Sequence, residues 1–202
     1  MQPAERTLVT EAEYLERERR AETKSELLHG EIVAMAGGSP RHNALSLNVG
    51  AAFRQRFRER RAPCVAFSSD QRIHSEVTGL YTYADVSVSC GGARFHPKHR
   101  DTLVNPKLVV EVLSKSTEAY DRGAKFAHYQ TIPSLSEYVL VSQYERRIEH
   151  FHLLETGQWL LTVLQGDEAR LLLPALGCEI PLGEIYDQTD EIDVDEAAPA
   201  SG

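Results

Sequence analysis

One acidic residue inside an apolar run is the strongest chemical signal in the sequence. Glu111 lies in Leu108-Val-Val-Glu-Val-Leu113, a segment that is otherwise apolar on both faces and therefore typical of a central buried strand. Burying a carboxylate costs on the order of several kcal/mol unless the group is paired or binds a cation. We therefore expect a cation beside Glu111, either a metal ion or a basic side chain.

A second carboxylate, Asp85, stands at the start of another apolar segment, Tyr83-Ala-Asp-Val-Ser-Val88. If the two strands are neighbours, Asp85 and Glu111 can converge, and two close carboxylates repel each other unless a metal ion or a proton lies between them. Oxygen ligands with an open coordination position suit Mg²⁺ or Mn²⁺. A second interpretation stays open, in which Asp85 caps a turn before its strand.

The segment Asp121-Arg-Gly-Ala-Lys125 supplies a basic side chain that can reach Glu111. From Glu111 the chain advances about four residues to the strand end at Lys115, or roughly 13 Å. The following helix returns from Thr117 to Lys125 over about eight residues, or roughly 12 Å, so Lys125 comes back to the level of Glu111. Two alternatives remain: a purely structural ion pair between Lys125 and Glu111, and an Asp121–Lys125 pair on a solvated helix face.

Caps, turns and hydrophobic spacing predict the elements that position these residues. The expected order is a helix from the capping box Thr10–Glu13 to about Ala21, a hairpin turning at His29-Gly30, a helix from Ser39-Pro40 to about Arg61 with Leu45, Val49, Phe53 and Phe57 as its apolar stripe, strands at 65–74, 82–89 and 107–113, a helix from Ser116 to about Gln130, a strand at 138–141, and strands at 147–153, 159–164 and 170–173.

This order predicts an α/β fold of the α+β kind. Helix, three strands, helix and strand form a core with a mixed sheet between helices, preceded by the N-terminal helix and hairpin. The strands at 107–113 and 138–141 flank a helix, so they should be parallel neighbours. The last three strands are expected to form an antiparallel meander.

Charge is distributed unevenly along the 202 residues. The segment 184–202 holds seven acidic residues and no Lys or Arg, so removing it from the net charge of −8 leaves −1 for residues 1–183. Its composition predicts a disordered acidic tail after a single domain over residues 1–183. Because residues 1–8 carry no apolar signal segment and no run approaches the roughly 20 apolar residues of a membrane span, we expect a cytoplasmic protein without a membrane partner.

Several other signals have a structural interpretation that we favour. Cys64, Cys90 and Cys178 are odd in number and far apart, which argues against a disulfide framework or a thiolate zinc site. Five of the eight histidines are expected at the surface, namely His42, His96, His99, His150 and His152, although His42, in the first turn of a helix, could point into a cleft. The most basic stretch, Arg54 to Arg61, could meet phosphates, but a solvated helix end is favoured.

At these residues the chain resembles the Uma2 family of the PD-(D/E)xK restriction endonuclease-like superfamily, over about Tyr14 to Tyr186. The resemblance is carried by Glu26-Leu-Leu-His-Gly-Glu-Ile-Val-Ala-Met35, Gly38-Ser-Pro-Arg-His-Asn43, Tyr83-Ala-Asp-Val-Ser-Val88, Val110-Glu-Val-Leu-Ser-Lys-Ser-Thr-Glu-Ala-Tyr-Asp-Arg-Gly-Ala-Lys-Phe126 and Pro133-Ser-Leu-Ser-Glu-Tyr-Val-Leu-Val141. The order of elements derived above is also the αβββαβ core of that superfamily.

The resemblance implies a catalytic site. Asp85 fills the position of the superfamily's aspartate, Glu111 that of its (D/E) residue, and Lys125 looks like its lysine moved onto the following helix, because Leu113 stands where a standard member has lysine. Ala84 replaces the usual proline. Glu26 matches an additional N-terminal acid. By the same resemblance, the Val112 carbonyl joins Asp85 and Glu111 as a ligand of Mg²⁺.

Three functions follow as hypotheses. The first is a Mg²⁺-dependent DNA endonuclease (Mn²⁺ being an alternative ion) that acts as a homodimer, since cutting two strands suits twofold symmetry. The second is a catalytically inactive nuclease-fold module that binds nucleic acid or protein, in which Glu111 and Lys125 form a structural ion pair. The third is metal-dependent hydrolysis of another phosphodiester. No G-x-G-x-x-G, P-loop or G-x-S-x-G motif supports nucleotide or serine hydrolysis.

Overall fold

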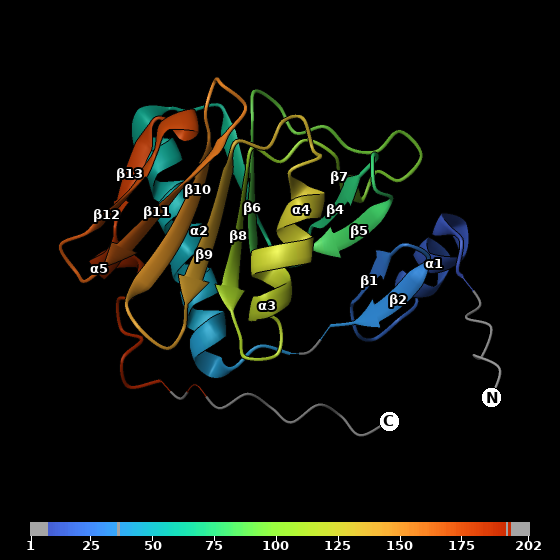
Figure 1. The fold of residues 1–202 in the computed structure, drawn as a ribbon, viewed down its shortest axis with the longest axis horizontal. Coiled ribbons are helices and arrows are strands. Elements are labelled where there is room, and N and C mark those ends of the chain that lie inside the picture. Colours follow the sequence, from blue (N-terminus) through green and yellow to red (C-terminus); the bar gives the residue numbers. More distant parts are fainter. Residues whose placement is uncertain (1–7, 36, 193, 195–202) are drawn as a thin grey trace.

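The fold consists of two sheets that meet at the centre of the molecule, with helices on both faces of the larger one (Figure 1). A computed structural model describes residues 8–35, 37–192 and 194. A six-stranded sheet has the order β11-β10-β9-β8-β6-β3, and a five-stranded sheet has the order β2-β1-β5-β4-β7. Strands β12 and β13 form a separate pair.

The helices and strands have the following bounds. The helical elements are α1 Glu11–Glu18, α2 Pro40–Arg60, α3 Glu118–Tyr120, the π-helical turn η1 Asp121–Lys125, α4 Phe126–Tyr129, the 3-10 turn η2 Pro174–Leu176 and α5 Leu182–Ile185. The strands are β1 Ser25–Leu28, β2 Glu31–Ala34, β3 Cys64–Ser68, β4 Arg72–Ser75, β5 Leu80–Tyr83, β6 Val86–Cys90, β7 Thr102–Leu103, β8 Leu108–Leu113, β9 Glu137–Ser142, β10 Arg147–Leu153, β11 Trp159–Gln165, β12 Arg170–Leu173 and β13 Cys178–Pro181.

The predicted fold class is confirmed. Helix α2, strands β3, β6 and β8, the helical segment α3–η1–α4 and strand β9 give the αβββαβ order around a mixed sheet. Strands β8 and β9 are parallel, as the strand–helix–strand pattern predicts. The N-terminal capping box and the hairpin are present, and the hairpin turn places His29 and Gly30 at φ 50° and 82°.

Helix α2 covers one face of the six-stranded sheet. Its N-cap is Ser39, whose hydroxyl accepts the His42 N–H, and Pro40 is its first residue. The predicted stripe is buried: Leu45, Val49, Phe53 and Phe57 are at most 6% exposed. These side chains share a core with β6, β8, β9, β12 and α5, while Phe126 and Tyr129 of α4 pack on the opposite face of β8 and β9. The sheet is therefore the middle layer.

Two expected strands are each divided between the sheets, which corrects the prediction. The segment 65–74 turns after Ser68 and becomes β3 in one sheet and β4 in the other. The segment 82–89 is likewise split into β5 and β6 at Ala84 and Asp85. At the second break buried apolar residues continue on both sides of Ala84, with Asp85 as the one charged residue, so the sequence gives little indication of a change of sheet. The first break does carry a polar interruption, Ser68-Ser-Asp-Gln-Arg72, which the prediction included in a single strand.

The C-terminal region also differs from expectation. Strands β10 and β11 form an antiparallel extension of the large sheet, but β12 pairs with β13 and does not join them. The predicted start of the disordered tail, residue 184, is too early in the sequence. Ile185 and Tyr186 are fully buried in the core, and Asn48 donates to the carbonyl of Ile185 at 3.0 Å. Of the expected tail, residue 193 and residues 195–202 lie outside the described residues.

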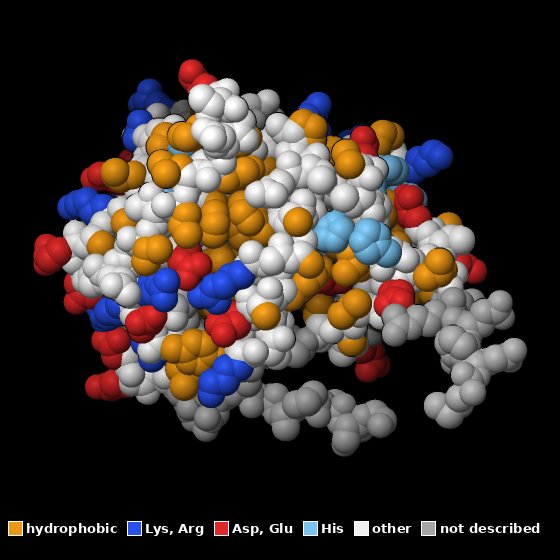
Figure 2. Space-filling model, viewed as in Figure 1, with side chains coloured by type: hydrophobic (Ala, Val, Ile, Leu, Met, Phe, Trp, Pro, Cys, Tyr) orange, Lys and Arg blue, Asp and Glu red, His pale blue; other side chains and the backbone are white. Residues whose placement is uncertain are grey.

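The surface carries both signs of charge. On the left of the face shown in Figure 2, Lys and Arg side chains lie beside Asp and Glu side chains. Ion pairs of the protein include those of Arg122 with Glu118 and Glu149 and those of Arg147 with Glu145 and Glu149. Within the described part of the chain, no helix is long and apolar enough to cross a membrane.

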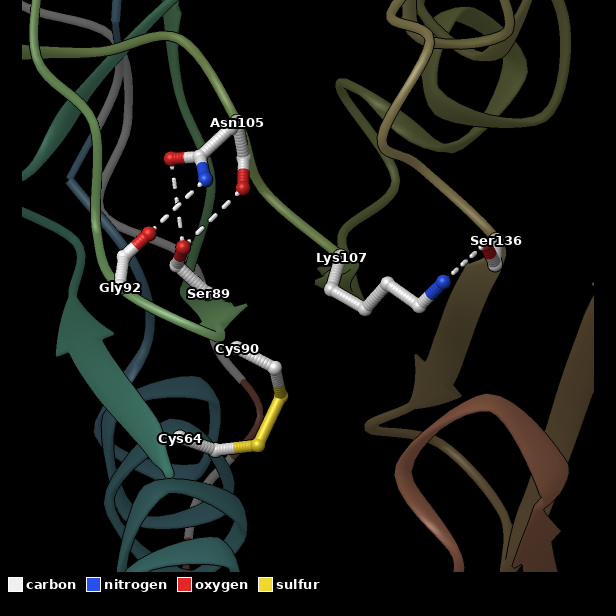
Figure 3. The surroundings of a disulfide bond; sticks show 7 residues. All are labelled: Cys64, Ser89, Cys90, Gly92, Asn105, Lys107 and Ser136. Carbon is white, nitrogen blue, oxygen red and sulfur yellow. Dashed lines mark hydrogen bonds between the residues drawn. A yellow bond between two sulfur atoms is a disulfide. The ribbon is translucent and has the colours of Figure 1, made fainter. Parts of the chain in front are cut away.

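A disulfide joins Cys64 at the start of β3 to Cys90 at the end of β6 (Figure 3). This corrects the expectation that all three cysteines are unpaired; Cys178 alone is free, and it is buried. The two residues are 26 positions apart in sequence but lie directly opposite each other in the antiparallel β3–β6 pair, with their Cα atoms 4.0 Å apart. Their pairing depends on strand register, which spacing alone does not show.

Reduction of this disulfide is expected to lower the free energy of unfolding by about 3 kcal/mol, because it opens a covalent loop of some 26 residues in the unfolded chain. Thermal unfolding with and without dithiothreitol measures the effect, and Cys64→Ala should melt at the reduced temperature in both conditions. The variant Cys178→Ala serves as control and should keep the response to reductant. A wild-type melting temperature that ignores reductant would contradict the assignment.

Candidate functional site

The predicted site residues surround one cleft of about 420 Å³ where the two sheets meet. Figure 1 shows the end of β8, the start of α2 and helix α3 coming together at this place. Five of the wall residues carry the candidate chemistry: Glu26 in β1, His42 in α2, Asp85 between β5 and β6, Glu111 in β8 and Lys125 in η1. Residues separated by almost 100 positions in sequence therefore face a common space.

Glu111 is buried in the middle of β8, where all six residues are inaccessible to solvent. Strand alternation places Val110 and Val112 in the core beneath α2 and Glu111 on the opposite side, facing η1 and α4. The Glu111 Oε1 atom lies 3.0 Å from Lys125 Nζ and accepts a hydrogen bond of 3.0 Å from the Tyr129 hydroxyl. The cation expected beside Glu111 is thus Lys125.

Lys125 returns to the level of Glu111, as the rise of strand and helix predicts. Its ammonium lies 3.2 Å from Glu26 Oε1 and 3.6 Å from Asp121 Oδ1, and it donates to the Tyr83 carbonyl at 3.2 Å. The alternative of a solvated Asp121–Lys125 pair is wrong, since the two side chains are only 4% and 6% exposed. Both belong to the π-helical turn η1, a rare conformation often found at functional sites.

Asp85 occupies the two-residue connection between the sheets. Pairing of β6 with β8 ends at Val86 and Val110, and the Asp85 Oδ2 atom accepts the next free N–H of β8, that of Val112, at 2.7 Å. Asp85 therefore continues the strand pairing with its side chain and does not cap a local turn. In an antiparallel pair the N–H and C=O of a residue point to the same neighbour, so the Val112 carbonyl is directed to the side of Asp85.

Glu26 lies in β1 and is buried. Its Oε1 atom accepts the Thr82 hydroxyl hydrogen in addition to its contact with Lys125. Because Glu26 and Thr82 belong to the five-stranded sheet and Glu111 to the six-stranded one, the lysine joins the two sheets. Glu26 was assigned to the site only from the family resemblance. In the structure it contacts the Lys125 ammonium, as Glu111 does.

His42 is the cleft residue that sequence analysis did not favour. Its Nε2 atom lies 3.2 Å from Asp85 Oδ2, and its side chain is 14% exposed. Two hydrogen bonds fix the first turn of α2, which carries His42. Ser39 donates to the Gln143 side chain at 2.6 Å, and Gln143 donates to the Leu113 carbonyl at 2.9 Å. The sequence signals for His42 are its place in the first turn of a helix and Gly38, whose missing side chain leaves room for the ring.

Alanine at Gly38 is expected to displace the imidazole of His42. An added Cβ would lie 2.5 Å from Nδ1 of His42, which is far inside van der Waals contact, so Gly38→Ala should destabilise the fold by about 1–2 kcal/mol and weaken the contact with Asp85. Gly37→Ala is the matched control, because its Cβ would meet nothing within 4 Å. Thermal melts of the two variants test this, and equal melting temperatures would contradict it.

Burial and the excess of acidic over basic groups in the cleft together shift the pKa values. Burial raises the pKa of Glu111 well above its usual range, and nearby Asp121 and Asp85 act in the same direction while Lys125 opposes them. Burial would lower the pKa of Lys125, but Glu111, Glu26 and Asp121 raise it well above the usual value, so Lys125 stays charged. For His42, burial is outweighed by the hydrogen bond and charge of Asp85, and the pKa is raised.

Oxygen donors dominate the part of the cleft that could hold a metal ion. Asp85 and Glu111 supply carboxylates and Val112 a peptide carbonyl, which is the donor chemistry that Mg²⁺ and Mn²⁺ prefer. Among the described residues, no group of three or more His, Cys, Asp or Glu side chains is arranged as a metal site. The donor set therefore fits one hard cation held by two side chains, a carbonyl and further oxygens from water or substrate.

The other histidines lie outside the cleft. His150 is buried and its Nε2 is 2.6 Å from the fully buried Glu137, and His152 Nδ1 is 3.1 Å from the same carboxylate, so the expected surface position is wrong for His150. The His96 and His99 rings stack on each other with centroids 4.8 Å apart and are partly buried. Their solvated-loop interpretation is therefore also corrected.

Comparison with known proteins gives a consistent result. The Uma2 family, described as "Putative restriction endonuclease", matches residues 11–183. Two proteins of Synechocystis sp., sll1609 and slr1290, are each 38% identical to this chain, over 81% and 86% of it and 92% and 89% of their own lengths. A crystal structure from Anabaena variabilis, described as "a putative nuclease belonging to DUF820", superposes with a TM-score of 0.73 at 16% identity, covering 90% of this chain and 99% of the other.

At 16% identity the Anabaena structure shows that the fold is shared. The family match spans most of the chain, including all five cleft residues, and the two Synechocystis proteins are aligned over nearly their whole lengths. The resemblance noted from separate sequence motifs is thereby confirmed. This chain belongs to the Uma2 family.

Proposed function

We propose that this protein hydrolyses phosphodiester bonds of DNA at the cleft between the sheets, with Mg²⁺ or Mn²⁺ as the metal. The observation that carries the proposal is the convergence of Asp85, Glu111 and Lys125 from three separate elements on one cleft. Membership of a family of nuclease-like proteins supports a nucleic-acid substrate. The proposal also includes a homodimer in the cytoplasm, and light scattering of the purified protein tests the dimer.

Each cleft residue has a defined part in this proposal. Asp85, Glu111 and the Val112 carbonyl would hold the metal ion, which supplies a polarised phosphoryl oxygen and a more acidic bound water. Lys125 stays charged and would orient the attacking water and offset negative charge in the transition state. Glu26 and Tyr83 fix the ammonium by accepting its remaining hydrogens.

The test is cleavage of supercoiled plasmid in Mg²⁺ or Mn²⁺ by the wild type and Glu111→Gln. The amide keeps the volume of the carboxylate and removes a metal ligand, so we expect nicking to fall at least about 100-fold. Glu149→Gln is the matched control, since it changes an acid of β10 bound to Arg122 and Arg147 outside the cleft. Equal nicking by both variants would exclude the assigned site.

A second candidate is a nuclease-fold binding module without catalysis. Lys125 already occupies the space between Glu26, Glu111 and Asp121, which favours a structural role for the ion pair. Calorimetric titration with Mg²⁺ separates the two functions, because an ion pair needs no metal. Absence of both Mg²⁺ binding and plasmid cleavage would favour the binding module.

A further inference from the structure

Three arginines at the end of α2 lack the acidic partners that most others have. Arg54, Arg58 and Arg61 form no ion pair and no side-chain hydrogen bond with any described residue. By contrast, acidic groups pair with Arg19, Arg20, Arg41, Arg56, Arg72, Arg122, Arg146, Arg147 and Arg170. Arg17, Arg60, Arg94 and Arg100 likewise have no ion pair among the described residues, but Arg54, Arg58 and Arg61 are distinguished because they line one hollow together in a chain with a net charge of −8.

These side chains line a concave surface, which we call the arginine groove. The groove has a volume of about 410 Å³ and lies between the last turns of α2 and strand β3, with Phe57 as its buried floor. Arg54 and Arg58 also border a second hollow on the other side of the helix. All three arginines are exposed. Their guanidinium groups are therefore free to meet a ligand from solvent.

The opposite wall of the groove adds backbone donors. Strand β3 is the edge of the large sheet and pairs only with β6. The Cα atoms of Cys64 and Cys90 are 4.0 Å apart, which is the separation of a non-hydrogen-bonded antiparallel pair. The peptide groups of Cys64 and, two residues later, Ala66 thus face outward from the sheet, and both residues line the groove.

The spacing of the cations matches a nucleic-acid strand. Four and three helical residues separate Arg54, Arg58 and Arg61, or about 10 Å in total. A B-DNA strand carries one phosphate per about 3.4 Å of axis, so about three phosphates fit this length. A guanidinium also matches phosphate oxygens with paired N–H donors. The groove lies about 18–28 Å from His42 along α2, so it is distinct from the cleft.

We infer that the arginine groove binds phosphates of duplex DNA and anchors the substrate away from the cleft. The inference deepens the proposed function and takes its ligand from it. It explains how a protein of net negative charge would hold a polyanion: the contact is made locally, by Arg54, Arg58 and Arg61 with the outward N–H groups of β3. The favoured sequence interpretation, a solvated helix end, agrees with the exposure of all three arginines, and the inference adds a ligand for them.

The test is anisotropy of a fluorescent 20-base-pair duplex in EDTA, where no cleavage occurs, between 50 and 200 mM salt. Arg54→Gln/Arg58→Gln/Arg61→Gln should reduce the slope of log affinity against log salt by about 2–3, since each lost phosphate contact removes about 0.9. Arg17→Gln/Arg20→Gln/Arg170→Gln removes the same charge from exposed positions elsewhere and should leave the slope unchanged.

The outcomes separate this inference from the proposed function. Plasmid cleavage by the wild type together with equal slopes for the two triple variants overturns the arginine groove and leaves the hydrolase intact. A reduced slope only in the groove variant, without any plasmid cleavage, supports the groove and removes the hydrolase. Failure of the wild type to bind the duplex, or equal competition by polyglutamate, overturns the inference because the ligand would not be DNA.

Discussion

Replacing Lys125 by alanine is expected to lower the free energy of unfolding by about 3–5 kcal/mol, because the substitution leaves buried carboxylates without their cation. Glu26, Glu111 and Asp121 all lie within 3.6 Å of the ammonium, and their side chains are at most 6% exposed. Urea denaturation at neutral pH measures the change. Few single substitutions in this chain should cost as much.

Lys107→Ala is the matched control for this prediction. Lys107 is half-buried and donates to the Ser136 hydroxyl, and its ammonium forms no ion pair with a described acid, so its loss should cost only about 1 kcal/mol. The double variant Lys125→Ala/Glu111→Gln should recover at least about 1 kcal/mol relative to additivity, since it removes an orphaned charge. Equal losses for the two lysines would show that the ammonium does not hold the acids together.

Asp85→Asn is expected to reduce plasmid cleavage about 1,000-fold while preserving the fold. An asparagine oxygen can still accept the Val112 N–H, so strand pairing is retained and unfolding should change by about 1 kcal/mol at most. The lost carboxylate charge removes several kcal/mol of metal-assisted stabilisation, and about 1.4 kcal/mol corresponds to tenfold in rate. Initial rates of nicking in Mg²⁺ measure the effect.

The control for Asp85→Asn is Asp167→Asn, an exposed acid paired with Arg146 far from the cleft. Its nicking rate should equal that of the wild type. Calorimetry adds a readout that a structural role would not change: Asp85→Asn should weaken Mg²⁺ binding while its melting temperature stays near that of the wild type. A variant that cleaves normally would remove Asp85 from the proposed metal site.

The return of Lys125 to Glu111 was predictable because it depends only on the rise of strand and helix. The burial of Glu111 was also predictable, since a strand that is apolar on both faces is buried on both faces, and Glu111 is buried with it. The π-helical turn that carries Lys125 has no comparable sequence signal. It changes the direction of Asp121, which is buried beside the lysine although its i,i+4 spacing is typical of a solvated pair.

Other features were not predictable because they depend on contacts between distant elements. The position of His42 in the cleft depends on how α2 docks against β8 through Ser39 and Gln143. The Cys64–Cys90 bond depends on the register of β3 and β6. The segment around Ala84 continues through a change of sheet with Asp85 as its one charged residue, and local periodicity there does not distinguish one long strand from two short ones. The polar residues 68–72, by contrast, mark the other change of sheet.

The position of Lys125 at the boundary of the two sheets has a consequence for the motions of the molecule. Its ammonium binds Glu26 and the Tyr83 carbonyl of the five-stranded sheet and Glu111 of the six-stranded sheet. A ligand that draws the ammonium towards Glu111 lengthens its contacts with Glu26 and the Tyr83 carbonyl. The amide protons of β1 and β2 should then exchange faster with deuterium. The exchange rate of this hairpin would therefore indicate whether a ligand is bound in the cleft, to which β1 contributes Glu26.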